Sequence, residues 1–267
     1  MNFSLQILGA ASAMPISEMN PSAQALTVQG RLFLIDCGEG TQQRMRQMHL
    51  SFLKVEAIFI SHIHGDHIFG LFGVLSTMAM YNRTEVLHIF GPESLGPILK
   101  FYQSFWGEGT NFEIAFHPVS VKGLEEVYSS KHCRVSAFPL QHKIECYGYR
   151  FDEIVTERHR SENPSYRPNS FAYCSDTVAF PELAGWVKGV GLLYHEATYP
   201  REMADKAVKH WHSTGEQAAQ CAKDAGAGRL VIGHYSSRIT DFDALLQECR
   251  DVFPDTVAGQ DGQVLDF

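Results

Sequence analysis

Long hydrophobic runs are absent from this sequence, and no stretch approaches the roughly 20 apolar residues that a membrane-spanning helix needs. An excess of positive charge is also absent, because 22 Lys and Arg residues are outnumbered by 30 Asp and Glu residues, for a formal net charge of -8. This balance argues against a broadly basic nucleic-acid-binding surface, although bound divalent cations are not counted in it. Low-complexity tracts and internal repeats are missing as well.

Paired cysteine motifs are the next absence. Six cysteines are scattered over 267 residues without a C-x-x-C pair, whereas disulfide frameworks are typical of short secreted chains. The N-terminal segment has no basic region of the kind that opens a secretory leader, and Gln6 interrupts its short apolar stretch. We therefore expect reduced thiols, a cytoplasmic location without membrane association, and a first strand over residues 3–8.

Strand-like segments dominate the first half of the chain. They include ALTVQGRLFLID, with a tight turn at Gln29 and Gly30, and then VEAIFI, VLHIFG, RVSAFPLQH and ECYGYRFDE. Two apolar segments between them, IFGLFGVLSTMAMYN and ESLGPILKFYQSFW, are expected to be helices. The second half alternates strand and helix from SFAYCSDT to DFDALLQECRDVF. This order predicts a single α/β domain over residues 1–267, with mixed sheets and helices packed outside them.

Four potential metal ligands lie within the short segment SHIHGDH: His62, His64, Asp66 and His67. His62 and His64 are two residues apart on an extended segment, so their side chains point the same way and can hold one cation. Gly65 permits a sharp turn, after which Asp66 and His67 are redirected and can serve a second cation. Because a divalent metal needs more ligands than these, further His or Asp residues are expected at later strand ends.

Three later residues meet that expectation, since each follows an apolar strand and precedes a turn or helix. α/β folds build their sites at the C-terminal ends of strands. We assign two ligand sets and one shared ligand: His62, His64 and His142 for one cation, Asp66, His67 and His234 for the second, and Asp176 between them. Imidazole and carboxylate ligands without cysteine suit two zinc ions, with manganese or iron as alternatives. A lone histidine is more often structural, but seven residues in matching contexts favour a metal site.

These motifs resemble those of a known family. H-x-H-x-D-H after an apolar strand resembles the signature of the metallo-β-lactamase superfamily. In order along the chain, LGAASAMP, FLIDCGEGTQQRM, YCSDT, HEAT, HSTGEQAA and IGHYSSR are similar to motifs of ribonuclease Z, the tRNA 3′-processing endonuclease, over residues 8–238. The resemblance implies a four-layer αββα sandwich of two mixed sheets with outer helices. It also implies a dinuclear zinc site with the ligands assigned above, precursor tRNA as substrate, and a homodimer.

The resemblance further implies roles for three side chains. Asp66 would be both a metal ligand and the general base that helps to deprotonate the attacking water. His212, oriented by Glu196, would assist the departing 3′-oxygen. Such parts suit phosphodiester hydrolysis, because two metals about 3.5 to 4 Å apart can acidify water and clamp the phosphate, and a positioned acid contributes on the order of 10² to 10⁴ in rate. The alternative for Glu196 and His212 is an ordinary surface pair.

The segment after His234 offers candidate substrate contacts. Ser237 and Arg238 are candidates for binding a substrate phosphate, with Arg238 as a bidentate clamp. The alternative is a surface arginine beside serines that cap the following helix. Asp36 is expected to hydrogen-bond beneath the metals rather than to ligate them. The remaining histidines, His210 among them, are assigned no functional role.

Residues 154–169 depart from the family pattern. Many ribonucleases Z carry a long Gly- and Pro-rich arm at this place that grips the tRNA, whereas this chain has a short polar insertion with Arg158, Arg160 and Arg167. Three functions therefore stay open: trailer removal from precursor tRNA, hydrolysis of smaller phosphodiesters or related substrates by the same fold, and metal binding without catalysis. The third is disfavoured because the chain keeps all seven candidate ligands and His212.

Overall fold

The computed structural model describes residues 3–14 and 16–267, apart from the side chains of residues 158 and 159. Its strands form two seven-stranded sheets. The first sheet has, in spatial order, β14 (Val264–Asp266), β1 (Phe3–Gly9), β2 (Ala23–Val28), β3 (Arg31–Cys37), β4 (Val55–Phe59), β5 (Leu87–Pro92) and β6 (Ile114–Val119). The second has β13 (Thr256–Ala258), β12 (Arg229–Gly233), β11 (Leu192–Glu196), β10 (Ser170–Cys174), β9 (Tyr147–Glu153), β8 (Cys133–Pro139) and β7 (Glu125–Ser129).

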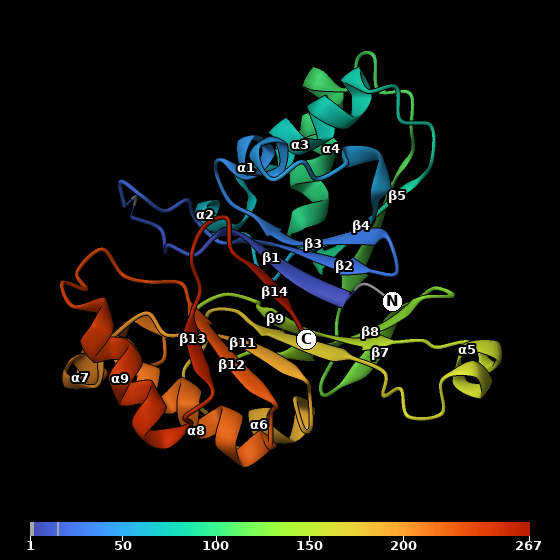
Figure 1. Cartoon of the computed structure of the whole chain (residues 1–267). Helices are drawn as coiled ribbons and strands as arrows, with labels where there is room; N and C mark the ends of the chain where they lie inside the picture. Colours follow the sequence, from blue (N-terminus) through green and yellow to red (C-terminus); the bar gives the residue numbers. More distant parts are fainter. Residues whose placement is uncertain (1–2, 15) are drawn as a thin grey trace.

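Helices cover the outer face of each sheet (Figure 1). On the first sheet lie α1 (Thr41–Gln47), α3 (Leu71–Met80) and α4 (Leu95–Trp106), and on the second α6 (Glu182–Trp186), α8 (Gly215–Ala225) and α9 (Phe242–Val252). Both sheets are mixed, because β3 to β6 and β10 to β13 run parallel while the other neighbouring strands are antiparallel. The predicted αββα sandwich is confirmed. Within the described ranges, no helix is both long and apolar enough to span a bilayer.

Strand β3 explains why the sandwich has more than one apolar layer. Phe33 and Ile35 join the layer between the two sheets, whereas Leu32 and Leu34 pack toward the helices on the outside. Side chains alternate along a strand, so a strand that is buried on both faces is apolar at nearly every position. The uninterrupted apolar run LFLI in the sequence follows from this two-sided burial.

Aromatic rings fill the space between the sheets. The ring of Phe59 on β4 lies 4.9 Å from that of Phe90 on β5, 5.2 Å from Tyr149 and 5.3 Å from Phe151, measured between centroids. Tyr149 and Phe151 belong to β9 of the second sheet, so these contacts join the two sheets directly. Aromatic pairs of this kind contribute about 0.5 to 1.5 kcal/mol each beyond their buried area.

The expected turn between β2 and β3 is present. Gln29 and Gly30 have φ angles of 49° and 83°. Positive φ at both central residues is the signature of the type I′ turn, whose twist matches that of the flanking strands. The hairpin therefore follows from two residues of local sequence.

One predicted helix was wrong in its extent. The segment IFGLFGVLSTMAMYN was expected to be one helix, but it is divided between α2 (Gly65–Ile68) and α3. At the division, the amide of Gly70 donates to the carbonyl of Cys37 over 2.8 Å. A Cβ atom at Gly70 would lie 2.0 Å from the carbonyl oxygen of Gly38, so only glycine allows this close approach. A tertiary contact thus replaces the helical hydrogen bond.

The insertion, for which the sequence predicted no helix or strand, contains α5 (Glu157–Glu162). Six further elements were not predicted from the sequence: α1, α7 (Ala204–His210), β6, β7, β13 and β14. Most of them are short, or lie at sheet edges where burial leaves a weak pattern. The six cysteines form no disulfide with one another, and all but Cys221 are buried.

The C-terminal segment ties down a loop of the N-terminal half through Asp261, whose side chain is 4% exposed. Oδ1 accepts the amide of Ala10 over 3.1 Å, and Oδ2 accepts the amide of Asn20 over 2.7 Å. The guanidinium of Arg44 lies 3.2 Å from the same Oδ2. Ala10 and Asn20 flank the loop of residues 11–19, so one carboxylate holds both of its ends.

We therefore expect Asp261→Asn to lower the free energy of unfolding by about 1 to 3 kcal/mol, because the amide nitrogen replaces one acceptor and leaves a backbone donor unpaired. Urea denaturation monitored by circular dichroism measures the change. The matched control is Asp255→Asn, which removes an ion pair of Arg229 with both side chains at least 40% exposed. That variant should change stability by less than about 0.5 kcal/mol; equal losses in both variants would contradict the assigned role of Asp261.

Candidate metal centre

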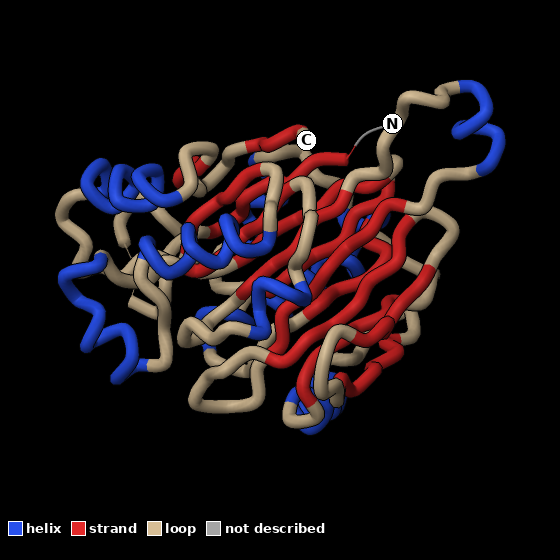
Figure 2. Tube along the Cα trace, turned by 90° about the horizontal axis from the view of Figure 1, so that it is seen from below, coloured by secondary structure: helices blue, strands red, loops and turns tan. Residues whose placement is uncertain are grey.

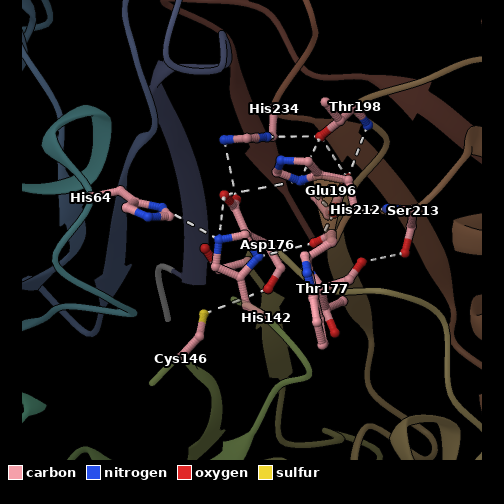
Figure 3. Close-up of polar contacts among 12 residues, drawn as sticks. His64, His142, Cys146, Asp176, Thr177, Glu196, Thr198, His212, Ser213 and His234 are labelled. Carbon is pink, nitrogen blue, oxygen red and sulfur yellow. Dashed lines mark hydrogen bonds and ion pairs between the residues drawn. The ribbon is translucent and has the colours of Figure 1, made fainter. Parts of the chain in front are cut away.

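All seven predicted ligands come together beyond the C-terminal ends of β4, β10 and β12. Figure 3 shows four of them: His64, His142, Asp176 and His234. The strand-end expectation is accurate for Asp176 and His234, which follow β10 and β12 closely. It was wrong in detail for His142, because β8 already ends at Pro139 and His142 lies in the following loop. His62 and His64 lie on extended backbone after β4, as expected.

The first ligand set brings three imidazole nitrogens together. His64 Nδ1 lies 2.9 Å from His62 Nε2 and 3.3 Å from His142 Nε2. Asp176 Oδ2 lies 3.6 Å from His62 Nε2 and 3.8 Å from His142 Nε2. The four atoms come from four separate side chains and face one small volume, which is the arrangement that a four-coordinate cation requires.

The second set uses the other oxygen of the same carboxylate. Asp176 Oδ1 lies 3.1 Å from His234 Nε2 and 3.5 Å from His67 Nε2. Asp66 Oδ2 lies 3.3 Å from His234 Nε2 and 3.4 Å from His67 Nε2. Asp176 therefore stands between the two sets, with one oxygen turned to each, in the place that the sequence assigned to it.

Two observations indicate that this donor set fits divalent cations. Among the described residues, Asp176 Oδ1 and His67 Nε2 are buried atoms without a hydrogen-bond partner, although polar groups in protein interiors are nearly always paired. Four carboxylates are also buried here, each at most 7% exposed: Asp36, Asp66, Asp176 and Glu196. Burying several like charges is costly unless opposite charge neutralises them. Divalent cations bound here would supply the missing partners and the missing charge.

The pKa of His67 also indicates that the site attracts positive charge. Burial disfavours the charged imidazolium, but the carboxylates of Asp66, Asp176 and Asp36 outweigh this and hold the pKa of His67 well above its ordinary value. A buried imidazole that keeps a proton against the cost of burial lies in a strongly negative environment. The site therefore favours any cation that can reach it.

Asp36 lies beneath the site and belongs to neither ligand set. Its Oδ1 accepts the backbone amide of Ser61 over 2.7 Å, and its Oδ2 accepts the Ser61 hydroxyl over 2.8 Å, the Tyr173 hydroxyl over 2.8 Å and His67 Nδ1–H over 2.7 Å. Because Nδ1 of His67 donates to Asp36, Nε2 is the nitrogen that faces the site, and it would become a ligand atom once a bound cation displaces its proton. Asp36 reaches this position with a φ of 55°. The predicted supporting role is what this geometry describes.

Two more ligands are oriented in the same way. His142 Nδ1–H donates to the backbone carbonyl of Trp211 over 3.0 Å, and His234 Nδ1–H donates to the hydroxyl of Thr198 over 2.8 Å. In both rings Nε2 is left free for the cleft. Sequence reasoning missed Thr198 and Trp211. Thr198 had a signal, since it lies two residues after Glu196 on extended chain, but the carbonyl of Trp211 had none.

Glu196 and His212 form a buried pair beside the ligands (Figure 3). His212 Nδ1 lies 3.0 Å from Glu196 Oε1, and the glutamate is fully buried while His212 is 14% exposed. Glu196 also accepts the amides of Thr177, Thr198 and Ser213. Burial opposes the charged form of His212, but the carboxylates of Glu196 and Asp176 outweigh it and raise the pKa of His212 to about 9. At neutral pH, His212 is thus an imidazolium whose Nε2 is not used by Glu196.

The cleft above these residues has a volume of about 450 Å³. Ser237 and Arg238 lie exposed on its rim, and Lys143 lines it as well. The only carboxylates among the described lining residues are Asp66 and Asp176, both of which belong to the ligand sets. The cleft therefore offers cationic groups to a phosphate, although the chain as a whole is acidic.

Comparisons with known proteins agree with this geometry. The family model described as a beta-lactamase superfamily domain matches residues 31–235. Ribonuclease Z of Bacteroides fragilis is 35% identical over 97% of this chain and 97% of its own length, and Ribonuclease Z of Porphyromonas gingivalis is 35% identical over 99% of both chains.

Solved structures give the same result. The short form of human tRNase Z has a TM-score of 0.81 and 26% identity, covering 98% of each chain. The metallo-beta-lactamase fold protein YhfI of Bacillus subtilis, at 19% identity, shares the fold with a TM-score of 0.79 over 100% of both chains. From its motifs, its fold and these relatives, the chain belongs to the ribonuclease Z family of the metallo-β-lactamase superfamily.

Proposed function

We propose that this protein is a metal-dependent endoribonuclease that removes 3′ trailers from precursor tRNA. One observation carries the proposal: the two ligand sets and the Glu196–His212 pair meet in one cleft. They do so on a chain that matches proteins named Ribonuclease Z over nearly its whole length. Metal binding alone would not need a protonated histidine held beside the ligands, whereas hydrolysis of a phosphodiester does.

The metal assignment is part of this proposal. His62, His64, His142 and one oxygen of Asp176 would hold the first cation, and Asp66, His67, His234 and the other oxygen of Asp176 the second. Imidazole and carboxylate donors suit zinc, with manganese or iron as alternatives. When bound, two such ions supply the acidification of water and the neutralisation of phosphate charge that this hydrolysis needs.

Asp66 is the group that receives the attacking water. Burial favours its neutral form, but His67 and His234 outweigh burial and hold the pKa of Asp66 well below its usual range. It is therefore a carboxylate at neutral pH, which is the form that can accept a hydrogen bond from a water molecule and orient it. Its Oδ2 is turned toward His67 and His234, so Oδ1 is the oxygen left for this task.

His212 is the proton donor to the departing 3′-oxygen. Its Nδ1–H is fixed by Glu196, so Nε2–H points away from the glutamate toward the cleft. Glu196 is held in turn by three backbone amides and the Thr198 hydroxyl, which limit its movement. Ser237 and Arg238 at the rim would bind a phosphate of the substrate, where a guanidinium can make two parallel hydrogen bonds.

A pair of variants separates metal binding from proton transfer. His64→Ala should lose metal and activity together, whereas His212→Ala should keep its metal and lose on the order of 10² to 10⁴ in kcat. Metal content by mass spectrometry and single-turnover cleavage provide the two measurements. Wild-type activity should fall as pH rises toward about 9, when His212 loses its proton, and this alkaline limb should be missing in His212→Ala. Full activity of His212→Ala on RNA would refute the proton-donor role.

The substrate is tested with two esters. Purified protein loaded with zinc is expected to release the 3′ trailer from a precursor tRNA and to hydrolyse a small bis-aryl phosphodiester more slowly. The second candidate function, hydrolysis of smaller phosphodiesters, is favoured by the short insertion, which lacks the length of a gripping arm. Cleavage of the small ester without trailer removal would establish that candidate instead. Inactivity on both substrates with metal bound would leave a binding protein.

We also propose a cytoplasmic homodimer, as the family resemblance implies. Three large rings on α4 support a subunit contact, because Phe101, Phe105 and Trp106 are 55%, 66% and 60% exposed and pack on one another. An apolar patch of this kind commonly marks an interface. Multi-angle light scattering should give twice the chain mass of 29.9 kDa for the wild type and a monomer for Phe105→Glu. A monomeric wild type at micromolar concentration would exclude the dimer.

A further inference from the structure

One wall of the cleft is a continuous row of rings that leads away from the metal centre. The ring of His212 lies 5.3 Å from that of His234 and 6.1 Å from that of Tyr199, between centroids. Tyr199 is stacked on His210 at 6.3 Å. All four residues line the cleft, and His210, at the outer end of the row, is exposed. No role was predicted for His210 from the sequence, but the fold places it close to the proposed proton donor.

A basic helix face continues this row. Lys206, Lys209 and His210 occupy positions i, i+3 and i+4 of α7, so they are neighbours on one side of the helix, while Ala207 is buried. Both lysines are exposed, and neither forms an ion pair with a residue that the structure describes. The chain as a whole has a net charge of -8, so two exposed lysines beside the cleft make this surface more positive than the average for the chain.

The geometry of the displacement determines which part of an RNA would lie along this wall. In an in-line displacement, the attacking and departing oxygens lie at opposite ends of the phosphorus centre. If His212 gives its proton to the departing 3′-oxygen, the nucleotide that carries this oxygen must lie on the side of His212. Beyond His212, the wall continues to Tyr199, His210 and the basic face of α7.

We propose that His210, supported by Tyr199, forms a stacking subsite for the nucleotide immediately 5′ of the scissile phosphate. Lys206 and Lys209 bind the phosphates that precede this nucleotide. The inference rests on the proposed phosphodiester hydrolysis. It adds which part of the RNA lies along this wall, namely the nucleotides 5′ of the cut, running from His212 toward α7. Aromatic or imidazole rings combined with lysines are the usual means of holding a single strand without reading its sequence.

The position of the insertion makes this surface more important in the present chain. The insertion joins the end of β9 to the start of β10, whereas Asp176 follows the other end of β10. Helix α5 consequently projects from the end of the molecule opposite to α7, as both overall views show (Figures 1 and 2). Within one chain, contacts to the RNA close to the cut must therefore come from the cleft wall and α7.

Abasic substrates test the stacking subsite. His210→Ala should lower kcat/KM for a precursor tRNA at least about fivefold, the lower end of what one stacked base contributes. On a precursor lacking the base immediately 5′ of the cut, the loss should shrink to less than about twofold, because no base remains to stack. His210→Phe, which keeps a ring, should retain most of the wild-type rate on both substrates. A precursor that lacks the first trailer base should still show the full loss.

Equal losses on the intact and abasic precursors would overturn the stacking role, since they would indicate that His210 acts through His212. No loss on either would overturn it as well. These outcomes differ from failure of the proposed function, in which the wild type itself releases no trailer. His210 is exposed, so the variant is expected to fold, and a thermal melt equal to that of the wild type verifies this.

Salt dependence tests the lysines. In the double variant Lys206→Gln/Lys209→Gln, the plot of log(1/KM) against log salt should be less steep by about 1.4, which corresponds to two phosphate contacts on a single strand. The loss should fall on KM rather than kcat, because neither lysine reaches the reacting atoms. Lys223→Gln on the exposed face of α8 is the matched control and should leave the slope as in the wild type. An unchanged slope in the double variant would refute the phosphate contacts.

Discussion

Four carboxylates buried in and around the candidate metal centre are the constraint on which the rest of this structure depends. Asp36, Asp66, Asp176 and Glu196 repel one another, and none can remain charged in the interior without compensation. Each finds a different solution. Asp36 is satisfied by four hydrogen-bond donors, Glu196 by backbone amides and an imidazolium, and Asp66 and Asp176 by histidines whose ring nitrogens face the same space. The last of these arrangements leaves Asp176 Oδ1 and His67 Nε2, among the described residues, without a hydrogen-bond partner.

The fold supplies this arrangement by bringing the strand ends of two sheets to one place. The first sheet contributes the ligands that follow β4, and the second contributes those that follow β8, β10 and β12. Several backbone positions at the site are unfavourable by themselves: Asp36, Trp211 and His234 have φ angles of 55°, 63° and 59°. Such conformations cost about 1 to 3 kcal/mol each and persist where surrounding contacts hold them. Asp36 and Trp211 thereby place a carboxylate and a carbonyl against His67 and His142, and His234 places its own ring in the second ligand set.

Charge in this molecule is distributed in a way that its total does not reveal. A net charge of -8 would repel RNA at long range, and screening limits that repulsion to about 8 Å at physiological salt. In the cleft, by contrast, Lys143 and Arg238 are exposed to solvent. The two carboxylates among its described lining residues, Asp66 and Asp176, belong to the ligand sets and face the histidines. Recognition of a polyanion by such a protein has to be local, made by the cleft and the elements next to it.

The sequence by itself determined the chemistry. Histidines and aspartates placed at apolar strand ends are local patterns, so the seven candidate ligands and their proposed division between two sets were predicted from spacing. The mixed sheets with outer helices and the turn at Gln29 and Gly30 were equally local, since they follow from side-chain alternation and backbone preference, whereas the four-layer order of the sandwich came from motif similarity. Motif similarity added the roles of Glu196 and His212. The spacing of these residues in the sequence did not by itself predict that they form a pair.

The tertiary structure alone decided what orients and surrounds those groups. Asp36 meets Tyr173, and His142 meets the carbonyl of Trp211, only after segments distant in sequence have packed together. The end of α2 was likewise set by a contact with β3, and the role proposed for His210 arises from the place of α7 beside the cleft. Periodicity records which face of an element is buried, but it does not record which distant residue will lie against that face.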